Sequence, residues 1–279
     1  MQSAMLPCTM CREQKRAAEG NDGGIKYWWI LPFLSFFFSL NNQSFWIDEC
    51  CTALCAMQQG MEGCWKKICE IGGSDAQMAF YYYLLFLWHH LTGAESEWML
   101  RLFNIFWVFL SSWFFRKEPK ALVILLISPF FVYYSNELRP YMLQIAASCA
   151  VSMLFWQVSR GEPIKFHVFF GSLFFLCLTS LTGVVWALGF AAAFMVMAFR
   201  QFGERRFWRA LLWWIFPFSG LGAYYLYTLF LGARAVSISS SWIVNACASM
   251  YELSGLAGMG PSRLELRMCM TPDALWNMN

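Results

Sequence analysis

The chain has few charged residues for its length. Of its 279 residues only 13% are Asp, Glu, Lys or Arg, whereas 59% are hydrophobic and 19% are Phe, Trp or Tyr. So little polar surface does not coat a water-soluble globule. The composition therefore excludes an ordinary soluble protein and predicts an all-α, polytopic membrane protein.

Several other signatures are missing. The first apolar run begins only near residue 25, and no small-residue cleavage pattern follows it, which argues against a removed signal peptide. Residues 258–261 (Gly-Met-Gly-Pro) lack the Lys and the preceding strand of a phosphate loop. The basic residues gather in loops between apolar runs, where they mark topology and anionic lipid contact, so no nucleic-acid partner is expected.

Cysteine is plentiful, with eleven residues in the chain. Two of them form an isolated CxxC near the N-terminus, which alone is a weak sign of a zinc or redox site. Five fall in one predicted loop: Cys50, Cys51, Cys55, Cys64 and Cys69. If that loop faces an oxidising compartment, two of these cysteines can form a disulfide, although the sequence does not show which two.

Seven apolar runs predict about seven membrane-spanning helices, at 27–40, 99–115, 121–135, 141–158, 167–182, 184–199 and 211–231. This assignment places every strongly basic loop on the side of the N-terminus, which the positive-inside rule makes cytoplasmic. The prediction is a cytoplasmic tail at 1–26, a transmembrane domain at 27–231 and an outer tail at 232–279.

The segment 41–98 is predicted to be one large outer loop. Residues 51–71 show loose helical amphipathicity, and 80–91 are apolar but too short to span comfortably, so both are interpreted as helices on the membrane surface. The alternative is that 80–91 crosses the bilayer. That crossing would put the basic residues 116–120 outside, against the charge rule.

Two adjacent acids, Asp48 and Glu49, follow the first span within Trp46-Ile47-Asp48-Glu49. A carboxylate kept at the membrane edge is costly unless it is used, and it suits taking a proton from an acceptor hydroxyl. The plainer interpretation is that both acids mark the first turn of a helix, where negative charge is favourable.

A second polar island, residues 136–141, separates two apolar runs and contains Glu137, Arg139 and Tyr141. The planar guanidinium of Arg139 matches a phosphate group. Pairing of Glu137 with Arg139 at the interface is the structural alternative. Tyr81 and Tyr82 are first expected to form an aromatic belt at headgroup depth, with substrate contact as the second interpretation.

These motifs together carry a resemblance. Trp46-Ile47-Asp48-Glu49, the stretch from Tyr81 to Leu102, and 128–141 with its SP…YS.E.RPY pattern resemble the GT-C superfamily of membrane glycosyltransferases. The similarity is to the family 39-like branch related to protein O-mannosyltransferases and the lipid A aminoarabinose transferase. It covers about residues 30–231.

The resemblance implies an inverting hexosyltransferase on the outer face of a bacterial inner membrane, in the cell envelope. Its donor is a sugar on polyprenyl phosphate, and its acceptor is a hydroxyl of a lipid, glycan or protein. Asp48 is implied as general base and Glu49 as its neighbour. Glu137 and Arg139, with Arg101, Tyr141, Tyr81 and Tyr82, are implied as substrate or lipid-phosphate contacts. Some members hold a divalent metal and others need none, so the cofactor stays open.

One segment departs from the pattern. Where relatives usually read His-Pro-Pro-Leu-Tyr-Tyr, the chain has residues 77–82, Gln-Met-Ala-Phe-Tyr-Tyr. This departure, and a length short for the family, favour a rival interpretation as a non-catalytic or truncated relative that binds lipid or a partner. A transporter is the other rival, but it predicts charges or Gly/Pro breaks at mid-membrane depth, whereas these acids lie at the edge.

Overall fold

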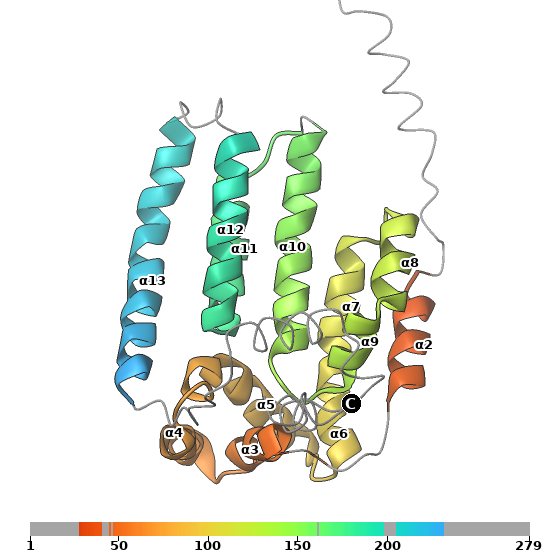
Figure 1. Ribbon diagram of the computed structural model, residues 1–279, viewed down its shortest axis with the longest axis vertical. Helices are drawn as coiled ribbons and strands as arrows, with labels where there is room; N and C mark the ends of the chain where they lie inside the picture. The colour runs from red at the N-terminus through yellow and green to blue at the C-terminus, as the bar shows by residue number, and fades with distance from the viewer. Residues whose placement is uncertain (1–27, 41–44, 46, 161, 198–204, 232–279) are drawn as a thin grey trace, which may run out of the picture.

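A computed structural model describes residues 28–40, 45, 47–160, 162–197 and 205–231 (Figure 1). The two predicted tails and Trp46 lie outside the described residues. The described residues form helices and no strand. The all-α prediction is therefore confirmed for this part of the chain.

The helices fall into two groups (Figure 1). One group stands side by side: α2 (Ile30–Ser39), α7 (Ile105–Phe114), α8 (Pro119–Ile127), α9 (Pro129–Asn136), α10 (Tyr141–Ser159), α11 (Phe166–Thr179), α12 (Leu181–Met197) and α13 (Arg205–Phe230). The other gathers across their lower ends: α3 (Ile47–Ala56), α4 (Gly60–Ile71), η1 (Ala76–Met78), α5 (Ala79–Thr92), α6 (Glu97–Arg101) and η2 (Leu102–Asn104). The segment predicted as surface helices thus forms a cap on the standing helices.

The standing helices run up and down alternately, with α8 and α9 following one another in the same direction (Figure 1). The connections that follow α7 and α10, and the first residues of α13, lie at the end away from the cap. These connections, the first turn of α8 and the first residues of α13 carry eight basic residues: Arg116, Lys117, Lys120, Arg160, Lys165, Arg205, Arg206 and Arg209. Other basic residues lie in the cap or against it, including Lys66 and Lys67 in α4, Arg101 in α6 and Arg139.

Two predicted helices are broken, each for a local reason. The predicted span 121–135 is two helices, because Ser128 is extended (φ −61°, ψ 125°), as a residue before proline tends to be. The predicted surface helix 51–71 is also two helices. Gly60, at φ +78°, provides the left-handed conformation where α4 begins.

Other boundaries differ less. The predicted span 99–115 begins earlier, in α6, and passes through the 3₁₀ turn η2 before α7. The last predicted span also begins earlier, because Arg205, Arg206 and Arg209 belong to α13. Arginine is a good helix former, so charge alone did not end that helix.

One described helix, α10, is long and apolar enough to cross a membrane by length and composition. Helices α2, α11 and α12 are apolar but shorter. Large apolar side chains are nevertheless exposed on α12 and α13, including Val196 at 82% and Phe216 at 86%. An exposed apolar surface of this kind marks a face that contacts lipid or another protein.

The tight connection between α11 and α12 depends on Gly183. The backbone N–H of Gly183 donates to Ser180 Oγ at 3.1 Å. A Cβ at Gly183 would overlap the carbonyl oxygen of Leu176 and would lie 2.5 Å from Thr179 Oγ1. These two contacts leave no room for a side chain, since one of the opposing atoms belongs to the backbone.

We expect Gly183→Ala to lower the free energy of unfolding by about 1–3 kcal/mol through overpacking. The measurement is thermal or denaturant unfolding of the purified chain in detergent. Gly189→Ala in the same helix is the matched control, because nothing lies within 4 Å of its new Cβ. Equal stability of the two variants would contradict this account of the turn.

Candidate functional site

The paired acids begin helix α3, as the plainer interpretation of the sequence also predicted. They then separate. Glu49 is buried, with 2% of its surface exposed, whereas Asp48 is partly exposed. The Asp48 carboxylate makes no hydrogen bond to the part of the chain that the structure describes. Of the two acids, Asp48 is therefore the more accessible from outside the protein.

Glu49 forms a buried ion pair with Arg101 at the end of α6. Arg101 Nη2 lies 2.8 Å from Glu49 Oε2, and Arg101 Nε donates to Glu49 Oε1 at 3.3 Å. The backbone N–H of Leu138 donates to the same Oε1 at 2.7 Å. Glu49 therefore ties the start of α3 to α6 and to the island between α9 and α10.

The buried Arg139 forms a second ion pair, with the partly buried Asp75. Its Nη1 lies 2.8 Å from Asp75 Oδ1 and donates to Tyr82 Oη at 2.8 Å and to Thr52 Oγ1 at 3.2 Å. Tyr82 in turn donates to Asp75 Oδ1. Arg139 Nη1 also lies 3.4 Å from the backbone carbonyl of Asp48. This cluster joins α3, the segment before η1, α5 and the polar island.

Burial raises the pKa of the Tyr82 phenol well above its ordinary value; Arg139 opposes that rise and Asp75 adds to it. Tyr82 therefore keeps its proton at neutral pH and donates it in the hydrogen bond to Asp75. The phenol acts here as a fixed donor within the cluster.

The other predicted contacts lie beside this cluster. Tyr81 donates to Asn104 Oδ1 at 3.0 Å, and Asn104 Nδ2 donates to the Glu137 carbonyl at 2.7 Å. Glu137 is buried, and Tyr141 packs its ring on Tyr134 with centroids 4.7 Å apart. Asn104 therefore holds the backbone of the island against α5.

The aromatic-belt interpretation does not hold for Tyr81 and Tyr82. Both side chains are fully buried inside the cap, where no headgroup reaches them. Their hydroxyl groups bond to Asn104 and Asp75, so they support the polar cluster. The second interpretation was contact with the substrate, and two side chains without exposed surface do not offer that contact in this structure either.

Three residues of this cluster escaped the sequence analysis: Thr52, Asp75 and Asn104. Asp75 follows Gly72, Gly73 and Ser74, a composition typical of a turn. The signal that could have found it is a lone acid placed just before the Tyr81-Tyr82 motif. Thr52 and Asn104 carry no distinguishing pattern, since single polar residues are common in helices.

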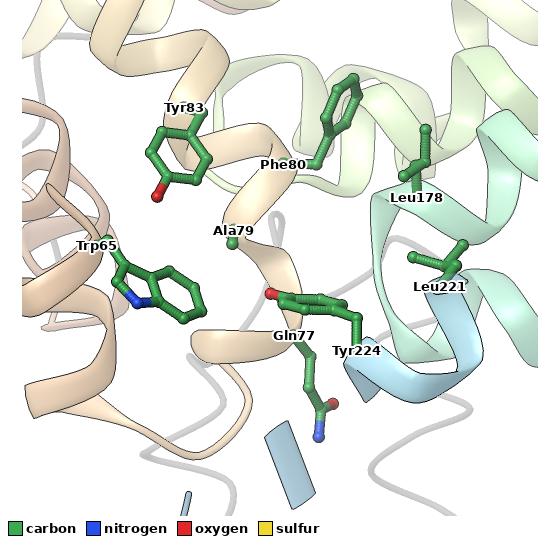
Figure 2. Close-up of a pocket in the computed structure, with 8 residues that line it drawn as sticks. All are labelled: Trp65, Gln77, Ala79, Phe80, Tyr83, Leu178, Leu221 and Tyr224. Atoms are coloured by element: carbon green, nitrogen blue, oxygen red, sulfur yellow. The ribbon is translucent and has the colours of Figure 1, made fainter. Parts of the chain in front are cut away.

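A cavity of about 460 Å³ lies where the cap meets α11 and α13 (Figure 2). Its walls come from the cap and from the ends of α11 and α13: Trp65, Gln77, Ala79, Phe80, Tyr83, Leu178, Leu221 and Tyr224. The Tyr224 hydroxyl donates to the carbonyl of Ala76, the residue after Asp75. The segment that holds Asp75 therefore also forms one wall of the cavity.

The described residues do not form a group of three His, Cys, Asp or Glu side chains that could hold a metal ion. No step of the proposal below is routed through a metal. The cysteines of α3 and α4 are free thiols in this structure.

Comparison with protein-family models, with curated proteins and with solved structures gives no match for this chain. The function of the cluster is therefore inferred from its residues and their contacts, together with the motif resemblance.

Proposed function

We propose that the chain is a polytopic membrane glycosyltransferase of the GT-C type. It transfers a sugar from a polyprenyl-phosphate donor to a hydroxyl acceptor, with inversion. The cap faces outward, and the basic connections face the cytoplasm, as the positive-inside rule requires. The large apolar side chains exposed on α12 and α13 support a lipid-facing surface on these helices.

One observation carries this proposal. Three motifs separated by up to 91 residues meet at the start of α3, through Glu49 with Arg101, Glu49 with the Leu138 N–H, and Arg139 with the Asp48 carbonyl. Buried charges are costly and need a complete set of partners. The chain maintains one buried ion pair, Glu49 with Arg101, and one partly buried pair, Asp75 with Arg139, around the partly exposed carboxylate of Asp48. This is the arrangement expected of a reactive group on a fixed support.

The chemistry follows from these positions. The acceptor hydroxyl oxygen attacks the anomeric carbon of the donor sugar, and Asp48 takes the hydroxyl proton. The bond from the anomeric carbon to the phosphate oxygen breaks, and its electron pair leaves with the polyprenyl phosphate. The new glycosidic bond forms on the opposite face, which inverts the anomeric centre.

Of the two arginines, Arg139 is the better phosphate contact. Its Nε–H is buried and has no hydrogen-bond partner in the described residues, so a phosphate oxygen would satisfy it. Arg101 directs Nε and Nη2 at Glu49. We therefore assign Arg101 as a positioning residue that holds Glu49 and, through it, the backbone of the island next to Arg139.

The experiment is a transfer assay in membranes that contain the full chain. The donors are radiolabelled sugars on polyprenyl phosphate, with the matching nucleotide sugars as the comparison. We expect label to enter a lipid, glycan or protein fraction from a polyprenyl donor only. Membranes without the chain give the background. Label that moves from no polyprenyl donor, or equally from nucleotide sugars, would exclude the proposal.

A further inference from the structure

The cavity between the cap, α11 and α13 is lined mainly by apolar and aromatic side chains, but its wall also carries groups that can form hydrogen bonds. Figure 2 shows Trp65, Tyr83 and Tyr224 around it, with rings that come from three different helices. The Trp65 and Tyr224 ring centroids lie 6.5 Å apart at 42°. Gln77 stands at the edge below Tyr224. A volume of 460 Å³ is within the range of small-molecule sites, which are mostly apolar with a few placed polar groups.

Three polar groups of the wall are available to a ligand. The Trp65 indole N–H, the Gln77 amide and the Tyr83 hydroxyl make no hydrogen bond to another described residue, and none of them is a buried unsatisfied atom. The Tyr224 hydroxyl, by contrast, is occupied by the Ala76 carbonyl. The cavity therefore presents flat aromatic faces together with open donors and an acceptor.

The segment that departs from the family pattern forms this wall. Gln77, Ala79 and Phe80 line the cavity, and Gln77 belongs to the 3₁₀ turn η1. Met78 has φ −110° and ψ 13°, a conformation disfavoured before proline. Prolines at 78 and 79 would therefore oppose η1. The residues that replace the family's His-Pro-Pro thus allow the 3₁₀ turn η1 to form, and this turn places the Gln77 amide at the cavity.

We propose that this cavity binds a sugar ring of the acceptor, with its apolar face on Trp65 and its hydroxyl groups on Gln77 and Tyr83. A pyranose has C–H faces that stack on aromatic rings and hydroxyl groups in its plane that need partners. The wall supplies both. This inference rests on the proposed transferase function and narrows its acceptor to a glycan or glycolipid.

The position of the cavity suits an acceptor. Gln77 lies two residues after Asp75, and Tyr83 directly follows Tyr82, so the two segments that line the cavity also carry residues of the Arg139 cluster. A sugar held there lies beside the residues that support Asp48. An apolar chain would use the rings but would leave the amide and the hydroxyl without partners, which disfavours it.

The test is a binding experiment that does not depend on transfer. The full chain is labelled with 5-fluorotryptophan, and the Trp65 signal is assigned by its loss in Trp65→Phe. The probes are methyl glycosides of mannose, glucose and N-acetylglucosamine, with farnesyl phosphate as the apolar alternative. We expect a saturable shift of the Trp65 signal with at least one glycoside, and about tenfold weaker binding in Gln77→Leu.

Gln157→Leu, at the far end of α10, is the matched control and should leave binding unchanged. Gln77→Asn keeps the amide and separates loss of the group from misfolding. A Trp65 shift with farnesyl phosphate alone, or with no probe, would overturn the inference. Glycoside binding without any transfer would contradict the transferase and leave the sugar site standing; transfer without glycoside binding would contradict the sugar site alone.

Discussion

We expect Asp48→Asn to lower the rate of sugar transfer about 10²-fold to 10⁴-fold, the range for loss of a positioned general base. The amide has nearly the same shape as the carboxylate but does not accept the proton of the acceptor hydroxyl. The fold should be retained, because the Asp48 side chain makes no hydrogen bond to the described residues, and its contacts with Thr52 and Arg139 use the backbone carbonyl. The measurement is initial transfer rate at saturating donor.

Glu62→Gln is the control for this change, since Glu62 is an exposed acid in the first turn of the neighbouring helix α4. It should leave the rate unchanged. Donor binding by the Asp48→Asn protein should also stay within a few-fold of wild type. A variant that transfers at the wild-type rate would remove Asp48 from the chemistry and favour a lipid-binding role for the cluster.

The sequence predicted the part of this site that depends on composition and order. The low content of charged residues predicted an all-α membrane protein, and the described residues are helical. The two acids were predicted to mark the first turn of a helix, and they lie in the first turn of α3. The motifs of 46–49, 81–102 and 128–141 were predicted to belong together, and described residues from all three do make contact. Periodicity and motif order carry information of this kind, since they act along the chain.

The partners of each charge were not predicted. Pairing of Glu137 with Arg139 was the structural alternative to phosphate binding, whereas the carboxylate 2.8 Å from Arg139 Nη1 is that of Asp75, 64 residues away. Likewise nothing in the Asp48-Glu49 pair indicated that one acid would be buried and the other partly exposed. Those outcomes depend on how α3 packs on α5 and α6, which is set by the whole cap.

Glu49 and Arg101 are the residues whose loss should destabilise the chain most. Their side chains are 3% and 4% exposed, and 2.8 Å separates the closest charged atoms. Arg101→Met leaves the Glu49 carboxylate buried without its cation, and Glu49→Leu leaves the guanidinium buried alone. Removing one partner of a buried pair costs about 3–5 kcal/mol. We expect a loss of that size for each variant, measured as the free energy of unfolding in detergent.

The double variant Glu49→Leu/Arg101→Met should be more stable than either single variant, because it leaves no unpaired charge in the cap. Its free energy of unfolding should still be about 1–3 kcal/mol below that of wild type, because the Leu138 N–H loses the Glu49 oxygen that accepts its hydrogen bond.

The partly exposed pair of Arg160 and Glu118 is the control. Its charged atoms lie 2.7 Å apart, yet Arg160→Met should lower the free energy of unfolding by about 1 kcal/mol or less. The two pairs have nearly the same distance between their charged atoms, so the difference in cost comes from the burial of the Glu49–Arg101 pair. If Arg101→Met and Arg160→Met were equally mild, the cap would not be held by this ion pair, and Arg101 would again be a candidate for direct contact with the donor phosphate.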